Sequence, residues 1–179
     1  MRIPKRLETC RLIIRRYTAN DLEMLHEFLN NKDVIGLTDM PLNTSKEETE
    51  AFLQMLIDSY TTEEPVAAMA ICLKETENVI GSCGFAAVDF SNDTQIYYAL
   101  EPEFRNNGFA TEAMEKLIEY MILVLDIDRI CIYCHPENIA SMNLAKRIGM
   151  QQQTIVQEKD RDAHYFLLTR EKYLSGNKV

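Results

Sequence analysis

The sequence contains no tryptophan and few residues that break regular structure, with 6 glycines and 5 prolines among 179 residues. No stretch is rich in glycine, proline or serine, which excludes a collagen-like, low-complexity or linker-rich chain. No period repeats, so a solenoid or propeller is also excluded. A chain of this length buries roughly 70% of its unfolded surface. We therefore predict a single domain over residues 1–179.

Long apolar runs are absent, although 46% of the residues are hydrophobic. No run approaches the roughly 20 residues that cross a bilayer. The basic N-terminal residues are not followed by the apolar stretch of a signal peptide. We expect a cytoplasmic protein without a membrane partner. The five cysteines are odd in number and lie mostly in apolar, strand-like runs, which favours reduced core thiols over a disulfide framework.

Positive charge is scarce over most of the chain. Residues 1–16 carry six Arg or Lys against one Glu, whereas the remaining residues carry 13 basic and 27 acidic side chains. A nucleic-acid-binding protein needs rows of cations that displace phosphate counterions, so we predict no nucleic-acid partner. The acidic body suits a cationic acceptor. The basic N-terminal segment could bind one anion or a partner, or it could bind no ligand; the sequence does not decide between these roles.

Hydrophobic periodicity predicts four helices and seven strands. The expected helices cover about 20–30, 45–60, 108–125 and 139–148, and the expected strands cover about 11–17, 66–73, 79–88, 95–100, 129–134, 153–157 and 163–169. Thr18 with Asp21, and Thr44 with Glu47, are start signals for the first two helices. A strand, a long helix and a strand predict a parallel crossover in an otherwise antiparallel sheet, hence a mixed α+β fold.

The segment 97–112 is the most informative part of the sequence. A strand is followed by a turn with Pro102, and Arg105-Asn-Asn-Gly108-Phe-Ala110 then opens a helix. The first turn of a helix leaves N–H groups unpaired, and Gly108 and Ala110 are small enough for a phosphate to approach them. Arg105 adds a charge-assisted fork. The pattern predicts a pyrophosphate cradle; a glycine-containing helix start with a solvated Arg105 is the alternative reading.

Five segments in a fixed order carry a family resemblance. They are Thr9-Cys-Arg-Leu-Ile-Ile-Arg-Arg with Asp21, Val79-Ile-Gly-Ser-Cys-Gly84, Tyr98-x-Leu100-x-Pro102-x-x-Arg105-x-x-Gly108-x-Ala110-Thr-Glu-Ala113, Asn138-x-x-Ser141 with Lys146-Arg-Ile-Gly149-Met150, and Leu167-Leu-Thr-Arg-Glu-Lys-Tyr173. Together they resemble the GNAT acyltransferases, most closely the ribosomal-protein alanine N-acetyltransferases of RimJ/RimL type. The resemblance runs almost end to end. It implies a three-layer α/β GNAT fold with a mostly antiparallel seven-stranded sheet, one splayed parallel strand pair and four helices.

The resemblance implies acetyl-CoA as the acetyl donor. The residues expected to hold its pyrophosphate are Arg105, Asn107, Gly108, Phe109, Ala110 and Thr111. The pantetheine arm is expected to pair beside Leu100, after a bulge between Leu100 and Pro102, and an N–H near Leu100 is expected to polarise the thioester carbonyl.

The resemblance also implies a direct attack of the amine on the thioester, which needs an acid for the leaving thiolate. Ala145 stands where many family members have a tyrosine. The resemblance to the alanine N-acetyltransferase branch, which uses a serine one turn after Asn138, implies Ser141 as the acid instead, with CoA contacts from Ser141 and Asn138. From the residues alone, a helix-interior Ser141 and an N-cap Asn138 are the favoured readings.

A base for the attacking amine is expected among the carboxylates. The resemblance points to Glu158 or Asp160, and Glu101 is a third choice. Each of them is otherwise a solvated surface charge, the commoner fate of a lone carboxylate. A water chain is a further alternative, because deprotonation of an amine needs only a modest base.

The segment Cys131-Ile-Tyr-Cys134-His135 matches a c-type haem attachment string, and its CxxC part matches a redox or zinc motif. Residues three apart on a strand point to opposite faces, whereas a shared metal needs them to converge. No second Cys or Cys/His pair stands at zinc spacing. We therefore predict no metal.

The leading prediction is an N-acetyltransferase that acts on a primary amine, with a protein N-terminal alanine as one acceptor. The alternatives are a small amine, such as a polyamine, amino sugar, amino acid or drug, or a non-catalytic acyl-CoA-binding module on the same scaffold. A nucleotide-binding oxidoreductase lacks its GxGxxG motif after an early strand. The acceptor loops are expected near 31–43 and 159–162. The resemblance is compatible with a monomer or a homodimer.

Overall fold

The computed structural model describes residues 2–36, 45–63, 65–89, 91–158 and 161–176. Its internal contacts divide the chain into two units: Met1–Gly84 with Tyr98–Lys116, and Phe85–Tyr97 with Leu117–Val179. The prediction of one domain over 1–179 stays a prediction.

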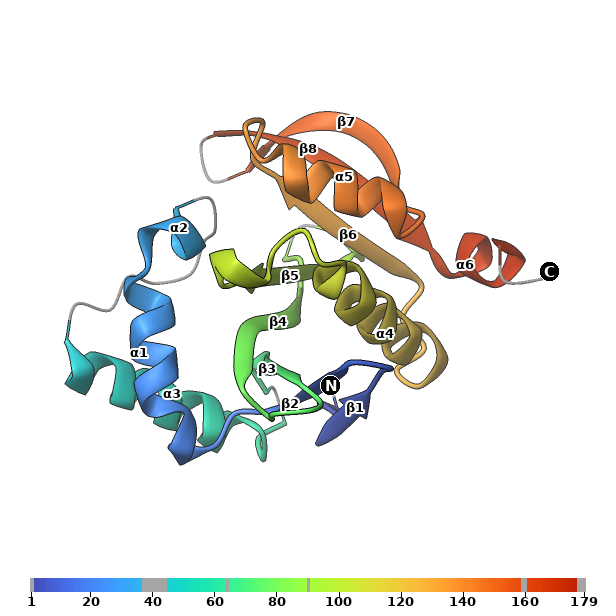
Figure 1. Ribbon diagram of the computed structural model, residues 1–179. Helices are drawn as coiled ribbons and strands as arrows, with labels where there is room; N and C mark the ends of the chain where they lie inside the picture. The colour runs from blue at the N-terminus through green and yellow to red at the C-terminus, as the bar shows by residue number, and fades with distance from the viewer. Residues whose placement is uncertain (1, 37–44, 64, 90, 159–160, 177–179) are drawn as a thin grey trace. The chain divides into compact units, whose positions relative to one another are not determined.

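The described residues form eight strands, six α-helices and two 3-10 helices (Figure 1). The strands are β1 (Arg6–Glu8), β2 (Leu12–Arg16), β3 (Ala67–Leu73), β4 (Val79–Ala87), β5 (Thr94–Leu100), β6 (Arg129–Cys134), β7 (Gln151–Glu158) and β8 (Arg161–Thr169). The helices are η1 (Ala19–Asp21), α1 (Leu22–Asn30), α2 (Lys32–Ile35), α3 (Lys46–Ser59), η2 (Pro102–Phe104), α4 (Phe109–Leu123), α5 (Ile139–Arg147) and α6 (Arg170–Gly176). The strand order is β1-β2-β3-β4-β5-β6-β8-β7.

The first unit is built on antiparallel strands that α1 and α3 cover on one face. Leu7 pairs with Ile14, and Ile14 pairs with Ile71, so β1, β2 and β3 follow one another across the sheet. Alternate residues of β3 join the core under α1 and α3, which lie side by side in Figure 1. This core contains Ile13, Tyr17, Leu25, Phe28, Leu29, Val34, Leu53, Leu56, Ala68, Ala70, Cys72 and Ala99. Since its other face is also buried, β3 is a near-continuous apolar run.

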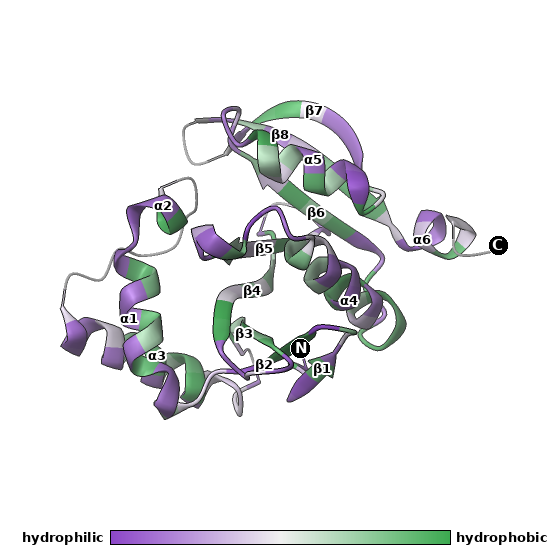
Figure 2. Cartoon of the chain, viewed as in Figure 1, coloured by the Kyte–Doolittle hydropathy of each residue, from purple (hydrophilic) through white to green (hydrophobic). Residues whose placement is uncertain are grey.

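The second unit contains the parallel strand pair. Strand β5 pairs with β6 at Thr94–Ile130 and Gln95–Cys131, and over the described residues this pairing does not continue to Ile96. The connection through α4 is the predicted parallel crossover, and the opening after two residue pairs agrees with a splayed pair. Strand β6 pairs with β8 along its whole length. Figure 2 shows β6 as largely apolar, whereas the start of the edge strand β7 is polar.

A polar cluster fastens the starts of β5 and β6 to β8. The buried carboxylate of Asp93 accepts hydrogen bonds from Arg129 Nε at 2.6 Å and from the Tyr165 hydroxyl at 2.6 Å. Tyr165 stacks on Tyr133 with ring centroids 5.4 Å apart. Burial, then the hydrogen bond to Asp93, raise the pKa of Tyr165 to about 12. The phenol therefore stays a hydrogen-bond donor at neutral pH.

The fold class predicted from the sequence is confirmed, and four details are wrong. The sheet has eight described strands rather than seven, because the short β1 pairs with β2 without any apolar pattern of its own. The structure has six described α-helices rather than the four expected, because α2 and α6 are too short to produce a periodic pattern in the sequence. The second start signal lies one residue later, at Ser45 with Glu48. The closing strand begins at Arg161 rather than Ala163, and the motif segment 167–173 continues past the end of this strand at Thr169 into α6.

Candidate functional site

The turn between β5 and α4 has a tightly defined backbone. Strand β5 ends at Leu100, and Pro102 begins the 3-10 turn η2. Asn106 and Gly108 then adopt left-handed conformations, with φ of 62° and 80°. Such angles are unfavourable for residues with a Cβ atom, and glycine alone adopts them without strain. The chain thereby reverses into α4 within a few residues.

The start of α4 has the features of an anion site. Its first hydrogen bond runs from the N–H of Glu112 to the carbonyl of Gly108, at 3.1 Å. The N–H groups of Phe109 and Ala110 precede that bond and carry the partial positive charge of the helix end. Gly108 presents no side chain in front of them. These residues therefore fit a pyrophosphate group, which would receive backbone N–H donors there.

Arg105 is oriented toward the protein. Its Nε donates to the Leu100 carbonyl at 3.1 Å, and its Nη2 donates to the Asp33 carbonyl at 2.7 Å. The guanidinium therefore ties η2 both to the end of β5 and to α2, and two of its donors are already used. Asn107 is also engaged, since its Nδ2 donates to the Arg105 carbonyl at 2.9 Å. Direct contacts of either residue with pyrophosphate stay predictions.

A cluster that sequence reasoning missed lies beside this turn. Arg11 donates from Nε to Glu112 Oε2 at 2.7 Å and from Nη1 to the Asn107 carbonyl at 3.1 Å. Its guanidinium lies over the Phe109 ring, 4.4 Å from the centroid. Thr9 Oγ1 and the Arg11 N–H both donate to Glu112 Oε1, at 2.5 and 2.8 Å. Two motifs that are about 100 residues apart in sequence thus meet.

The second unit contains the other predicted CoA residues. Asn138 caps α5, and its Oδ1 accepts from the Ser141 N–H at 3.0 Å. The N-cap reading of Asn138 is thus correct, and a CoA contact through its Nδ2 stays a prediction. Ser141 is buried at 8% exposure, and its Oγ accepts from Cys134 Sγ at 3.3 Å. Ala145, at the usual tyrosine position, is also buried.

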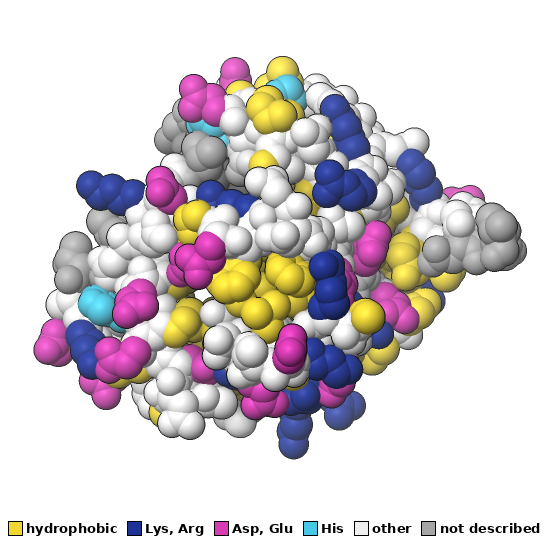
Figure 3. Space-filling model, viewed as in Figure 1, with side chains coloured by type: hydrophobic (Ala, Val, Ile, Leu, Met, Phe, Trp, Pro, Cys, Tyr) yellow, Lys and Arg dark blue, Asp and Glu magenta, His cyan; other side chains and the backbone are white. Residues whose placement is uncertain are grey.

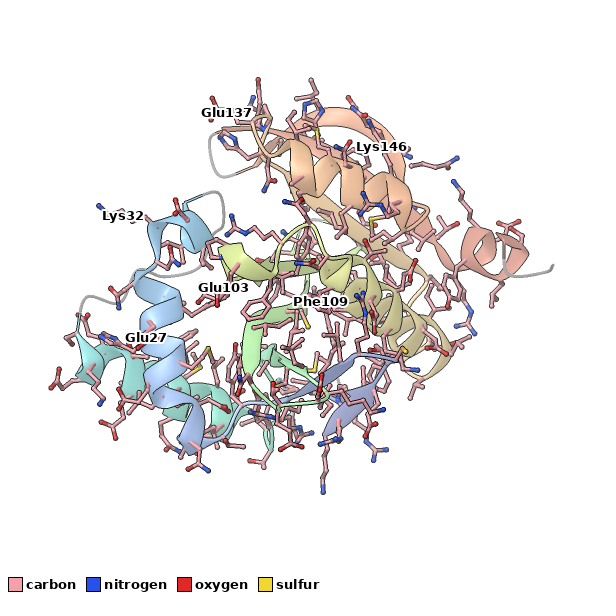
Figure 4. All side chains as sticks on the ribbon, in the orientation of Figure 1. Glu27, Lys32, Glu103, Phe109, Glu137 and Lys146 are labelled. Atoms are coloured by element: carbon pink, nitrogen blue, oxygen red, sulfur yellow. The ribbon has the colours of Figure 1, made fainter. Side chains whose placement is uncertain are left out.

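Among the candidate bases, Glu101 is the one whose surroundings can be described. Burial raises the pKa of Glu101 above its usual value, although a hydrogen bond from Asn31 Nδ2 at 3.1 Å opposes this. The charges of Glu103 and Glu27 raise this pKa further, whereas the charge of Arg105 lowers it. Figure 4 labels Glu27 on α1 and Glu103 on η2. Three carboxylates of the first unit therefore act on one another near the end of β5.

The other two candidate bases are Glu158, at the end of β7, and Asp160, which follows it in the sequence. Glu158 is the last residue of β7, where its backbone pairs with Arg161. Asp160 lies outside the described residues. Their assignment as bases stays a prediction.

The surface charge of the first unit agrees with the basic N-terminal segment and the acidic remainder seen in the sequence. Figure 3 shows Lys and Arg side chains over β1, and Asp and Glu side chains over α1 and α3. Within the described ranges, no group of three or more His, Cys, Asp or Glu side chains is placed to bind a metal ion. None of the helices in the described part of the chain combines the length and apolarity needed to cross a bilayer.

Comparison with known proteins identifies the family. A family model described as an acetyltransferase (GNAT) domain matches residues 11–151, which is more than half of the chain. The protein therefore belongs to the GNAT acetyltransferase family and is an acyl-CoA N-acyltransferase. Members of this family use acetyl-CoA and an amine substrate.

Individual relatives agree with that assignment. The uncharacterised N-acetyltransferase p20 of Bacillus licheniformis is 29% identical over 174 residues, which cover 93% of this chain and 97% of p20. A Vibrio cholerae structure assigned as a ribosomal-protein-serine acetyltransferase has a TM-score of 0.78 at 20% identity, over 94% of this chain and 99% of its own. Spermidine N-acetyltransferase from Vibrio cholerae, in complex with CoA and spermine, has a TM-score of 0.77 at 18% identity, over 93% and 99%. At these identities, the two structures show the fold alone.

Proposed function

We propose that this protein acetylates a primary amine by direct attack on acetyl-CoA, with a protein N-terminal amine of the RimJ/RimL type as the acceptor. The observation that carries the proposal is the turn before α4, where Gly108 at φ 80° opens the first N–H groups of the helix. The almost end-to-end RimJ/RimL resemblance and the ribosomal-protein-serine acetyltransferase of the same fold support this acceptor class.

In this proposal each predicted residue keeps a defined role. The N–H groups from Gly108 to Thr111 receive the pyrophosphate, while Asn107 and Arg105 shape the turn. The pantetheine arm lies along the end of β5 at Leu100. Asn138 contributes its Nδ2 donor, because its Oδ1 is used to cap α5.

The chemical step needs no covalent enzyme intermediate. The neutral amine nitrogen bonds to the thioester carbonyl carbon, the C–S bond breaks, and the leaving thiolate takes a proton. Ser141 supplies that proton in our assignment, and its hydroxyl is restored by a proton from solvent. Its Oγ already accepts from Cys134, so its own hydrogen is free to point to another acceptor.

The proton of the attacking amine needs an acceptor. Glu101 suits this role best among the described carboxylates, because burial and neighbouring carboxylates raise its pKa toward that of a useful base. Glu158 and Asp160 are the other candidates.

A small polyamine is the second candidate acceptor. Glu27, Glu101 and Glu103 place negative charge near the end of β5, which suits a substrate with several positive charges. The spermidine acetyltransferase of the same fold supports this alternative. A non-catalytic acyl-CoA-binding module is the remaining alternative. We further propose that the protein is cytoplasmic, that it folds as one domain and that it is a monomer or a homodimer.

Steady-state release of CoA tests the proposal. Acetyl-CoA is offered with an Ala-terminated peptide, the same peptide with a blocked N-terminus, spermidine, an aminoglycoside and free amino acids. We expect turnover with the free peptide and none with the blocked one. If spermidine is the one amine of this panel that is acetylated, the polyamine acceptor replaces the protein N-terminal amine in the proposal. Binding of acetyl-CoA without turnover of any amine would favour the binding module.

A further inference from the structure

We infer that Arg11 is a positioning residue for acetyl-CoA, which holds the turn 106–110 in the shape that receives the pyrophosphate. The inference rests on the proposed function and goes beyond it, because it assigns a role to the basic N-terminal segment.

The Arg11 guanidinium contacts three residues around the start of α4, namely Asn107, Phe109 and Glu112. Its Nη1 donates to the carbonyl of Asn107, and its Nη2 lies 3.4 Å from where a Cβ of residue 108 would stand. Its plane covers the ring of Phe109, and its Nε is paired with Glu112. Because a guanidinium is flat and has donors in fixed directions, it fixes these groups relative to one another.

The turn needs such support. Asn106 has φ 62° and Gly108 has φ 80°, so the backbone passes twice through the left-handed region within three residues. Conformations of this kind persist where neighbouring contacts over-determine them. The bond to the Asn107 carbonyl lies between the two left-handed residues and holds the peptide that joins them.

Arg11 also balances a charge that opposes the ligand. Glu112 lies in the first turn of α4, and its carboxylate would repel a bound pyrophosphate. The ion pair with Arg11 and the hydrogen bond from Thr9 cover both carboxylate oxygens. Although burial alone would raise it, the hydrogen bonds from Thr9 and Arg11 hold the pKa of Glu112 below its usual value.

The backbone of Arg11 is itself held in place by neighbouring strands. Its carbonyl accepts from the Lys74 N–H at 2.8 Å, and its neighbour Leu12 is completely buried in β2. The Leu12 N–H also donates to Thr9 Oγ1 at 2.8 Å. The contacts of the side chain are therefore transmitted to the turn from a strand that is fixed in the sheet.

Calorimetric titration with CoA, dephospho-CoA and pantetheine tests the inference in wild type, Arg11→Gln and Arg11→Lys. Arg6→Gln is the matched control, because Arg6 is paired with Glu8 and is 46% exposed, against 47% for Arg11. We expect Arg11→Gln to raise the Kd of CoA and of dephospho-CoA roughly tenfold or more. The Kd of pantetheine, which lacks the pyrophosphate, should stay within about twofold. Arg11→Lys keeps the charge and loses the fork, so it should restore only part of the affinity.

Other results separate the possible failures. Unchanged CoA binding in Arg11→Gln overturns the inference, as does an equal loss for pantetheine, which would indicate general damage to the fold. A loss for CoA alone would mean that Arg11 binds the 3′-phosphate directly. If Arg11→Lys binds CoA as tightly as the wild type, the positive charge of Arg11 alone is sufficient, and the geometric role of its guanidinium is wrong. If the wild type does not bind CoA, the proposed function itself fails.

Discussion

Ser141 is held from two sides, through its N–H by Asn138 and through its Oγ by Cys134. We predict that Ser141→Ala lowers kcat about 100-fold, because the leaving thiolate loses its proton donor. The KM for acetyl-CoA should change much less. Asn143→Ala, an exposed change on the same helix, is the control and should leave kcat unchanged. Steady-state kinetics with the accepted amine measures both. Wild-type kcat in Ser141→Ala would remove the acid role.

Two glycines with the same backbone conformation allow a matched comparison. Gly108 has φ 80° and Gly149 has φ 85°. Alanine at either position should cost about 1–2 kcal/mol of stability. Only Gly108→Ala should also raise the KM for acetyl-CoA, because a Cβ there would lie 3.4 Å from Arg11 Nη2 and disturb the contacts that hold the turn, whereas a Cβ at Gly149 meets nothing within 4 Å. Thermal unfolding and acetyl-CoA saturation curves give the two quantities, and equal KM values would argue against the cradle.

Some site residues could be predicted from the sequence and others could not. The left-handed turn at Gly108 and the helix start at Phe109 follow from local rules, since a glycine directly before an apolar helical pattern marks such a turn, and pyrophosphate binding there stays a prediction. The contacts of Arg105 with Asp33, and of Arg11 with Glu112, join residues 72 and 101 positions apart. Local periodicity contains no information on such pairs.

At the scale of elements, an ion pair fastens the end of β2 to the start of α1. Arg15 donates from Nη1 and Nη2 to both oxygens of Asp21, each at 2.8 Å, and Asp21 is 5% exposed. Burial alone would raise the pKa of Asp21, but Arg15 and the Thr18 N–H hold it below its usual value. The pair therefore stabilises the fold above the unfolded pKa of about 3.9, and this contribution is lost as the pH falls.

We predict that Asp21→Asn lowers the unfolding free energy by about 2–3 kcal/mol at pH 7. The difference from wild type should shrink as the pH falls below about 4. Denaturant unfolding at several pH values measures it. Glu8→Gln breaks two exposed pairs, with Arg6 and with Lys74, and should have no measurable effect at pH 7. A pH-independent difference for Asp21→Asn would contradict the argument.

Elements with a strong pattern could be predicted closely. Strand β6 was expected at 129–134, where the structure has it, because its apolar residues are bounded by polar turns. Helix α5 ends before Gly149, a left-handed glycine. The three-residue β1 and the four-residue α2 were missed, since elements this short depend on pairing and capping rather than on periodicity. The expected end of the closing strand at Thr169 is correct, but the short α6 that begins directly after it was missed.

At the scale of the whole molecule, donor binding should stabilise the protein. A ligand that binds only the folded state at 100 times its Kd adds about 2.7 kcal/mol. For a chain of this size we predict a rise in Tm of about 5–10 °C with acetyl-CoA. Differential scanning fluorimetry measures it, with adenine as a control ligand. The shift should be smaller in Arg11→Gln, and no shift in the wild type would count against acetyl-CoA as the donor.

The fold class and the enzyme class followed from the sequence because five motif segments occur in order along the chain, and the family match over residues 11–151 agrees with them. The acceptor did not follow, because its expected loops, near 31–43 and 159–162, have no pattern that specifies a substrate.

The most direct test of acetyl transfer is mass spectrometry of a single-turnover mixture, with protein in excess over labelled acetyl-CoA. With the free-amine peptide or spermidine present, we predict that the labelled acetyl group appears on the acceptor amine and that the protein mass is unchanged. Without an acceptor, the label should stay on CoA. Label on the protein itself before an acceptor is added would contradict direct attack, and label that never leaves CoA with any amine would contradict the transferase assignment.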